Sequence, residues 1–353
     1  MWFFRLRTHQ CCFLLFNAIL FHALLFGADF VEEYLLQSSP NTYTDAQTLD
    51  IRERARKLTV GYIKSNASQF FCLSSSGACG HSNIFLLSII SSDVENSSRR
   101  DVIRRTWANV TRVRGYSVLT LFALGMPRTP DAQSDIRREF AKHGDLIQGK
   151  FLDGPENLTL KTIMIMQWAV TFCPKALFIL KSNEESFVNY VSLMGYLLGL
   201  RRHAEDLYIG RVQHQDMPNR NPLDANFVPV SQYASQRYPD YCSAAAFVIS
   251  QDVARKIYVV SADLGSSLPE AVFVGICAKR AGVVPTHSSR FSGNKHIRFN
   301  RCCYQFLFSS YGLSDEELGA MWEEISDSRD CSMLETYSGL IKCKALTYLD
   351  KLT

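Results

Sequence analysis

Two adjacent carboxylates, Glu184 and Glu185, follow an apolar run at residues 176–182 that is typical of a buried strand. Carboxylates at the end of a strand can hold a hard divalent cation, which in turn binds phosphate oxygens. The same pair at the start of a helix would instead form a solvated first turn that complements the helix dipole. The pattern alone therefore allows a cation and phosphate site in this loop without requiring one.

A second candidate group is a pair of arginines, Arg100 and Arg104, in a segment whose pattern predicts a helix over residues 98–107. Their spacing of four places both side chains on one helix face, which would suit recognition of a diphosphate. Surface solubility is the alternative. The sequence has no G-x-S-x-G, G-x-G-x-x-G or P-loop pattern, which argues against serine hydrolases, dinucleotide oxidoreductases and kinases.

Apolar runs that are typical of buried strands alternate with helical patterns from residue 83 onwards. Such alternation predicts an α/β fold with a mainly parallel sheet that helices cover on both faces. Ligands bind such folds beyond the carboxyl ends of the strands, where residues 183–185 fall. The predicted strands include residues 84–90, 117–125 and 176–182, and the predicted helices include residues 98–107, 134–144, 158–173, 269–282 and 314–326.

The composition indicates a folded protein with a substantial core. Of 353 residues, 47% are hydrophobic and 20% are charged, which excludes general disorder. The formal net charge is only +4, much less than a strongly basic nucleic-acid binder would carry. We therefore expect no nucleic-acid partner.

The N-terminal region predicts a membrane anchor. Residues 11–28 contain no Asp, Glu, Lys or Arg, and they follow Arg5 and Arg7. A run of this length is just sufficient to span a bilayer, and its basic flank should remain cytosolic. A cleaved signal peptide is the alternative. We expect a cytosolic tail (1–10), a signal anchor (11–28), a luminal stem (29–82) and one luminal domain (83–353).

Other features agree with a luminal location. Four glycosylation sequons begin at Asn66, Asn96, Asn109 and Asn157. The eleven cysteines include no C-x-x-C pair, so zinc ribbons and thioredoxin-like redox motifs are not indicated. Local disulfides could join Cys72 with Cys79, or Cys331 with Cys343, in an oxidising lumen. Cys173 and Cys277 lie in apolar segments and are expected to be buried free thiols.

Five segments in a fixed order resemble the β-1,3-galactosyltransferase and β-1,3-N-acetylglucosaminyltransferase family, whose members are Golgi type II membrane enzymes. The resemblance covers roughly residues 70–325. It implies a glycosyltransferase-A-type fold, a UDP-sugar donor, Mn²⁺ and inversion at the anomeric carbon. The segments are RRDVIRRTW (99–107), FLDGPENLTLKT (151–162), the FCP-to-FVN stretch (172–189), RYPDYCSAAAFVIS (237–250) and PEAVFVGICAKRAGVVP (269–285).

The resemblance also assigns roles to particular residues. The three consecutive aspartates of the family fall on Asn183, Glu184 and Glu185. Glu185 would be the principal metal ligand, Asn183 would face the ribose of UDP, and Glu184 would belong to the same nucleotide-sugar site. The resemblance places Arg100 and Arg104 near the nucleotide. His287 is a further candidate metal ligand, with a polar surface role as the alternative.

The sequence departs from the family pattern at positions that matter for catalysis. Two adjacent acids of the family fall on Glu270 and Ala271, and one of them is expected to be the general base. Glu270 supplies that base if it belongs at the first position. Residues 244–246 are alanines where the family has glycines, and Lys150 and Pro155 replace an aspartate and a tyrosine.

The resemblance thus predicts a Golgi β-1,3-glycosyltransferase that transfers galactose from UDP-galactose to the 3-hydroxyl of a glycan on a glycoprotein or glycolipid. Two alternatives remain open at this point. The donor could be UDP-N-acetylglucosamine, or the protein could be a catalytically impaired relative with a binding or regulatory role, since Asn183 and Ala271 replace acids.

Overall fold

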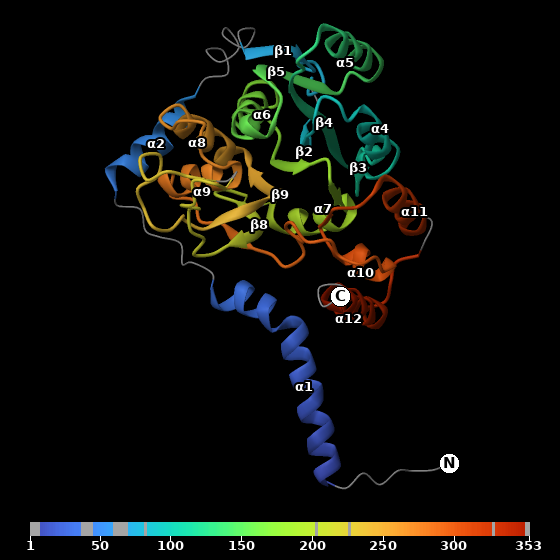
Figure 1. The fold of residues 1–353 in the computed structure, drawn as a ribbon. Coiled ribbons are helices and arrows are strands. Elements are labelled where there is room, and N and C mark those ends of the chain that lie inside the picture. The colour runs from blue at the N-terminus through green and yellow to red at the C-terminus, as the bar shows by residue number, and fades with distance from the viewer. Residues whose placement is uncertain are drawn as a thin grey trace.

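The structure is a computed structural model, and it describes residues 8–36, 45–58, 70–80, 83–201, 204–224, 227–326 and 329–349. The predicted cytosolic tail lies almost entirely outside these ranges, and so does the sequon at Asn66. The described chain forms one α/β domain with a long helix that projects from it (Figure 1).

A mixed, mostly parallel sheet forms the centre of the domain. Its four central strands, β5, β4, β2 and β6, are all parallel. Strand β9 pairs antiparallel with both β6 and β8, and β1 pairs antiparallel with β5. The order across the sheet is β1 (Phe71–Ser74), β5 (Leu146–Leu152), β4 (Tyr116–Met126), β2 (Ile84–Ser91), β6 (Phe178–Asn183), β9 (Tyr241–Ser250), β8 (Tyr208–Gln213) and β10 (Thr286–His287), with β3 (Arg112–Val113) beside β4.

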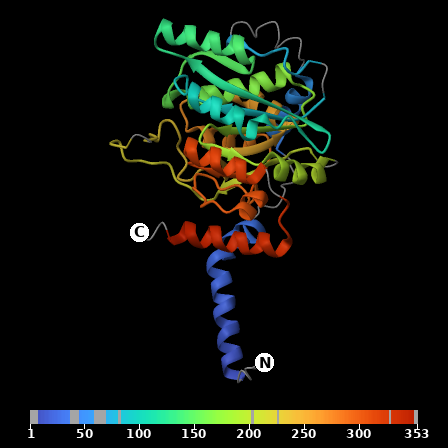
Figure 2. The same ribbon diagram turned by 90° about the vertical axis from the view of Figure 1, so that its right-hand side faces the viewer.

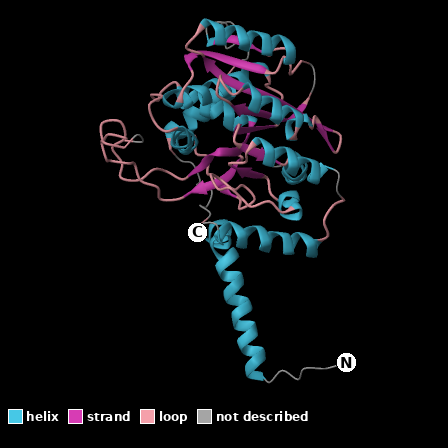
Figure 3. Cartoon of the chain, turned by 45° about the vertical axis from the view of Figure 1, so that its right-hand side comes forward, coloured by secondary structure: helices cyan, strands magenta, loops and turns pink. Residues whose placement is uncertain are grey.

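Helices cover both faces of this sheet (Figure 3). One core includes Leu87 and Ile89 of β2, and the other includes Leu86 and Ile90, so the strand is buried on both sides. The first face packs against α2 (Ala46–Lys57), α6 (Leu158–Phe172), α8 (Gln251–Ser261) and α9 (Glu270–Arg280). The second packs against α4 (Ser97–Arg105), α5 (Pro130–His143), α7 (Tyr190–Leu200), α10 (Arg301–Phe306), α11 (Asp315–Ser326) and α12 (Met333–Leu349).

The predicted fold class, an α/β domain with a mainly parallel sheet between helices, is confirmed. Helix ends also follow the expected local signals. Helix α5 ends at Gly144, whose φ of 67° is left-handed and suits glycine. Helix α6 ends just before Pro174, which cannot continue a helix.

Part of the predicted stem is packed into the folded domain. Helix α2 buries Ile51 and Ala55 against the core, and Arg52 donates a hydrogen bond to the carbonyl oxygen of Ala281 at 3.1 Å. Strand β1 extends the central sheet beside β5. The domain therefore includes segments before residue 83, because α2 and β1 add buried side chains such as Ile51 and Phe71 to its core.

The predicted local disulfides are wrong. Cys79 is bonded to Cys173, Cys302 to Cys331, and Cys303 to Cys343. Cys173 is thus not a free thiol, whereas Cys277 is free and buried as expected, and Cys72 is free and exposed. The turn after β1 lies beside the end of α6 in space, so tertiary proximity selects a partner 94 residues away.

The disulfide between Cys79 and Cys173 should contribute strongly to stability. It closes a loop of 94 residues, and cross-linking a loop of this size restricts the unfolded chain enough to stabilise the fold by about 4 kcal/mol. The double substitution Cys79→Ser and Cys173→Ser should lower the free energy of unfolding by this amount, measured by unfolding of the full chain in detergent. Cys72→Ser is the control and should change it by less than about 0.5 kcal/mol. An equal loss in the control would contradict the assignment.

The apolar N-terminal segment forms helix α1 (Thr8–Phe30), followed by a π-helical turn, η1 (Val31–Leu35). Residues Gln10–Leu35 are long and apolar enough to cross a membrane, and very little of this stretch is buried against the rest of the protein. Figure 2 shows α1 projecting from the domain at the side where α12 lies.

Candidate active site

A cluster of polar groups, in which Ser92 and Glu184 are buried and Asp93 is exposed, lies at the carboxyl ends of β2 and β6. Ser92 and Asp93 follow β2, and Glu184 follows β6, so the parallel strands bring these groups to one edge of the sheet. The backbone N–H of Glu184 donates to the carbonyl oxygen of Ser91 at 3.0 Å. The cluster therefore occupies the edge at which ligands bind in this class of fold.

Glu184 points toward the loop after β2. Its carboxylate accepts hydrogen bonds from the Ser92 hydroxyl, from Asn96 Nδ2 at 2.5 Å and from the Asp93 N–H at 3.4 Å. Burial raises the pKa of Glu184, and the bonds from Ser92 and Asn96 oppose that rise. Through these hydrogen bonds Glu184 links the end of β6 to the loop that follows β2.

The neighbours of Glu184 point in different directions. Asn183 Oδ1 accepts a hydrogen bond of 2.6 Å from the Ser186 hydroxyl. Glu185 is exposed, and a hydrogen bond between its side chain and the Tyr311 hydroxyl helps raise the pKa of that tyrosine to about 12. Of the three acid-loop positions, Glu185 therefore presents the most accessible carboxylate.

The predicted cation can be tested against these donors. Within the described residues, no group of three or more His, Cys, Asp or Glu side chains is arranged to hold a metal ion. Magnesium-type cations, however, are commonly held by one or two carboxylates together with phosphate oxygens and water. Glu185, which is exposed and follows Glu184 directly, provides such a hard oxygen ligand. The residues present therefore fit a cation that a bound diphosphate would help to hold.

Glu270 is the first residue of α9, and its side chain is only 8% exposed. Lys181 Nζ lies 2.5 Å from Glu270 Oε1, and the Thr162 hydroxyl donates to the same oxygen. Lys181 also donates to the carbonyl oxygen of Ala244 at 3.0 Å. Among the residues that the structure describes, the contacts of the carboxylate fall on Oε1 rather than on Oε2. This arrangement fixes the orientation of Glu270 while leaving its second oxygen for a ligand hydroxyl.

The two arginines predicted to bind a diphosphate are engaged within the protein. Arg100 is fully buried, and its guanidinium binds Glu139 at 2.7 Å, the Ser92 hydroxyl at 2.9 Å and the Asp93 carbonyl oxygen at 2.6 Å. Arg104 binds Glu139 at 2.7 Å. Burial alone would raise the pKa of Glu139, but hydrogen bonds from both arginines outweigh it and lower the pKa. Arg100 thus holds the loop that contacts Glu184.

His287 lies well away from Glu185 along the sheet. It belongs to β10, and strands β9 and β8 separate β10 from β6, a backbone distance of about 14 Å at the usual strand spacing. The Val212 N–H donates to His287 Nδ1 at 3.3 Å, and Glu32 Oε2 lies 3.1 Å from Nε2. Because Nδ1 accepts a backbone hydrogen bond, a neutral ring carries its proton on Nε2, the nitrogen that faces Glu32.

His287 should make stability depend on pH. Burial, together with the nearby Arg211, lowers its pKa to about 4 from 6.5. Between these values the unfolded chain binds a proton that the folded chain does not, so the free energy of unfolding falls as pH drops from about 6.5 to 4. The loss should reach about 3 kcal/mol, measured by thermal unfolding across this range. His287→Gln should flatten the profile, and an unchanged profile in that variant would contradict the assignment.

The described sequons occupy different settings. Asn96 Nδ2 is the atom that donates to Glu184, so a glycan on this nitrogen would replace one of its hydrogen atoms at the edge of the site. Asn109 is exposed at the end of the short 3₁₀ turn Trp107–Asn109. Asn157 Nδ2 donates to the carbonyl oxygen of Leu152 at 2.9 Å, just before α6.

Sequence reasoning missed three buried charges of the cluster, Lys161, Asp153 and Lys181. Lys161 Nζ lies 2.6 Å from Asp153 Oδ1 and donates to the carbonyl oxygen of Ser92 at 2.8 Å. The signal was available, since Lys161 interrupts a strongly apolar helix and Lys181 interrupts an apolar strand. A charge inside a buried element needs a buried partner, which marks both lysines as members of a polar network.

The alanines at residues 244–246 line the same region through their backbone. The carbonyl oxygen of Ala245 lies 2.9 Å from the Ser186 hydroxyl oxygen, which shares its one proton between this carbonyl and Asn183 Oδ1. The carbonyl oxygen of Ala244 accepts a hydrogen bond from Lys181. The side chains of Ala245 and Ala246 are buried. Their methyl groups therefore fill core space beside the site, and the chain at this point carries no glycine.

An α/β sheet that helices cover on both faces places this protein in the class of open-sheet α/β folds, whose ligands bind at the carboxyl ends of the strands, where the polar cluster lies. Comparison with known proteins narrows this class. The family model described as Galactosyltransferase matches residues 98–289. The chain is 57% identical to human Beta-1,3-galactosyltransferase 9 over 348 residues, which covers 99% of this chain and 94% of the relative.

More distant relatives are N-acetylglucosaminyltransferases. The chain is 36% identical to Lactosylceramide 1,3-N-acetyl-beta-D-glucosaminyltransferase B of Xenopus laevis, with 77% of this chain and 74% of the relative covered. Identity to the human Lactosylceramide 1,3-N-acetyl-beta-D-glucosaminyltransferase is 35%, with 76% and 73% covered. The chain therefore belongs to the galactosyltransferase family. The resemblance predicted from five short segments is confirmed, and the fold agrees with the glycosyltransferase-A-type architecture that it implied.

Proposed function

We propose that this protein is a β-1,3-galactosyltransferase that transfers galactose from UDP-galactose to the 3-hydroxyl of an acceptor glycan with inversion. The observation that carries the proposal is the carboxylate of Glu270. Its Oε1 is held by an ion pair with Lys181 and by a hydrogen bond from Thr162, near the end of β6. Family membership and 57% identity to a β-1,3-galactosyltransferase support the reaction and the donor sugar.

Glu270 acts as the general base in this proposal. Its Oε2 accepts the proton of the acceptor hydroxyl as that oxygen attacks the anomeric carbon, while the UDP group leaves from the opposite face of the sugar. Lys181 and Thr162 hold Oε1 and so aim the carboxylate. Inversion needs no covalent intermediate, because a single displacement is sufficient.

The other residues bind and orient the donor. Asn183 would bind a ribose hydroxyl of the donor in exchange for its contact with Ser186, and Glu184 and Arg100 fix the loop after β2. Glu185 would hold Mn²⁺ or a similar cation together with the diphosphate. That cation would stabilise the negative charge that develops on the leaving UDP.

We further propose that the protein is a single-pass type II protein of the Golgi membrane, with the domain in the lumen. Helix α1 is long enough to cross a bilayer, and Arg5 and Arg7 precede it. Three disulfides fit an oxidising compartment. The acceptor would be a glycan of a glycoprotein or a glycolipid.

A panel of UDP-sugars, assayed with Mn²⁺ on the purified full chain in detergent, tests the proposal. Transfer or hydrolysis should be fastest with UDP-galactose and should disappear in Glu185→Ala and in Glu270→Ala. Preference for UDP-N-acetylglucosamine would favour the donor of the more distant relatives instead. Failure of every donor to bind or react, with no effect of metal, would reject the enzymatic proposal.

A catalytically impaired binding or regulatory protein is the second candidate, and Ala271 is the observation that favours it. Ala271 is partly buried and packs against the core beside Glu270. If the required base belongs at this position, the wild-type chain is inactive. The double substitution Asn183→Asp and Ala271→Asp would then restore transfer, whereas in our main proposal it gives no large gain.

A further inference from the structure

Helix α12 turns an apolar face away from the domain. Its opposite face packs closely on α10, where a Cβ on Gly339 would come within 3.0 Å of Cys302 Cβ, and the disulfide between Cys303 and Cys343 fixes the contact. The outward face carries an unusual number of exposed apolar side chains. They are Met333 (90% exposed), Leu334 (81%), Tyr337 (43%) and Leu349 (57%).

The membrane-crossing helix α1 passes beside this face. The rings of His22 and Tyr337 stack with their centroids 5.8 Å apart, and those of Phe26 and Tyr337 are 6.5 Å apart. Lys344 Nζ lies 4.3 Å from the centroid of the Phe26 ring. In Figure 2, α12 lies crosswise at the upper end of α1.

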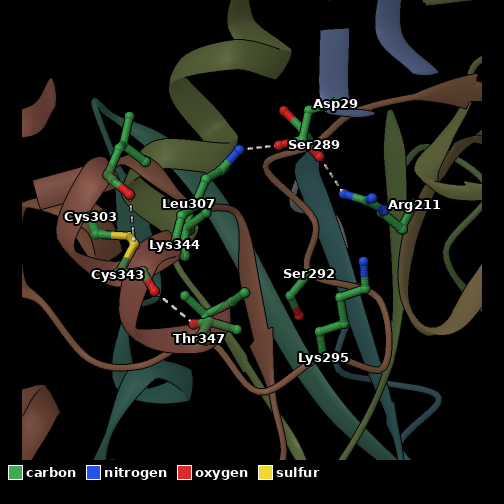
Figure 4. A pocket seen from close by; sticks show the side chains of 12 residues that line it. Asp29, Arg211, Ser289, Ser292, Lys295, Cys303, Leu307, Cys343, Lys344 and Thr347 are labelled. Atoms are coloured by element: carbon green, nitrogen blue, oxygen red, sulfur yellow. Dashed lines mark hydrogen bonds and ion pairs between the residues drawn. A yellow bond between two sulfur atoms is a disulfide. The ribbon is translucent and has the colours of Figure 1, made fainter. Parts of the chain in front are cut away.

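An ion-pair cluster fixes the direction in which α1 leaves the domain. Asp29, at the end of α1, binds Arg211 of β8 at 3.0 Å and also binds Lys344 of α12 (Figure 4). Glu32 binds Arg211 at 2.7 Å. Three elements that are distant in the sequence are thus joined at one point, so the position of α12 relative to α1 is defined.

These contacts set the depth of α12. His22 and Phe26 precede Phe30, the last residue of α1, by eight and four residues, or about 12 and 6 Å along the helix. A bilayer needs about 20 apolar residues of α1, so His22 and Phe26 must lie in or close to the luminal leaflet. Tyr337, which touches both rings, then lies at the membrane interface.

We propose that α12 is an interfacial helix whose apolar face lies in the luminal leaflet of the membrane that α1 crosses. Leu334 and Leu349 would enter the boundary between headgroups and acyl chains, while Tyr337 and the exposed Lys342 would remain among the headgroups. The inference rests on the proposed retention of α1 as an anchor. It gives the domain a second attachment, which restricts its tilt over the membrane.

Photo-cross-linking from single positions tests the inference. The full chain is reconstituted into phosphatidylcholine vesicles that contain an alkyne-tagged phosphatidylcholine. The photoreactive residue p-benzoylphenylalanine replaces Leu334 or Leu349 on α12. Leu14 on α1 is the positive control, and Leu223, a 95% exposed leucine in the loop between β8 and β9, is the matched negative control.

Lipid adducts at Leu334 and Leu349 should be comparable with those at Leu14 and at least about tenfold above those at Leu223. Adducts at Leu14 alone would overturn the inference about α12 but would support α1 as a membrane anchor. Adducts between α12 and a second protein chain would also overturn it and identify the face as a dimer contact. Adducts at none of the four positions would overturn both the inference and the anchor. Equal adducts at Leu223 and α12 would show no preferred face and would overturn the inference.

Discussion

Substitution of Glu270 by glutamine should slow sugar transfer by about 10²- to 10⁴-fold, the range that general-base catalysis usually contributes. Glutamine keeps the size of the side chain and can still accept the Thr162 hydrogen bond, but it cannot take up the acceptor proton. The effect should appear in single-turnover rates at saturating donor, while the affinity for UDP stays within about twofold of wild type.

The pairing of Glu270 with Lys181 requires a second variant. Glu270→Gln leaves a 1% exposed lysine without its carboxylate, and an unpaired buried charge can cost about 3–5 kcal/mol. Adding Lys181→Met removes that charge and should restore stability without restoring transfer. Recovery of transfer in the double variant would contradict the role of Glu270 as base, because its function would then be only to neutralise Lys181.

A matched control separates these effects from a general loss of charge. Glu316 is an exposed carboxylate in the first turn of α11. Glu316→Gln should leave both the rate and the free energy of unfolding unchanged within about 0.5 kcal/mol. An equal loss of rate in this variant would indicate that the assay responds to net charge rather than to the base.

Local sequence patterns predicted most elements of the fold. The apolar run at residues 84–90 became β2, buried on both faces, and the helix of residues 134–144 ends at Gly144. These features depend on nearest neighbours in the chain, such as side-chain burial and the left-handed conformation that glycine accepts. They are therefore readable from a single sequence.

Features that depend on long-range proximity were not predictable. The apolar run of β9 gives no sign that it lies antiparallel between β6 and β8, because a strand buried on both faces looks alike in either direction. Cys79 has the nearby Cys72 as an apparent partner, yet it bonds to Cys173. Both outcomes are decided by how distant elements pack.

The candidate site likewise combines residues that the sequence identified with contacts that only the fold determines. The loop at Asn183–Glu185 was located from its place after an apolar strand, and Glu270 was found through the family resemblance. The partners of these residues were not found, since Lys181 and Glu270 are 89 residues apart and only the fold brings them to 2.5 Å. The predicted diphosphate role of Arg100 rested on helix spacing and on the family resemblance, and neither reveals that Glu139 already binds the guanidinium.

The second large effect concerns Arg100. Arg100→Ala should lower the free energy of unfolding by about 3 kcal/mol, because it leaves Glu139 with fewer partners and frees the loop at Ser92 and Asp93. Thermal unfolding of the full chain in detergent measures this loss. Arg105→Ala, an exposed arginine on the same helix, is the control and should change stability by less than about 0.5 kcal/mol.

The same variant distinguishes a positioning role from direct contact with the donor. A direct contact with the diphosphate would weaken donor binding in Arg100→Ala while leaving the unliganded protein as stable as wild type. A positioning role predicts lost stability first, with weaker binding only as a consequence of the displaced loop. Combining Arg100→Met with Glu139→Leu should therefore recover part of the stability, since the buried pair is removed together and Arg104, which loses Glu139, keeps Asp145 as a partner at 2.8 Å. Failure to recover it would mean that the hydrogen bonds to Ser92 and Asp93, rather than the ion pair, are what the fold requires.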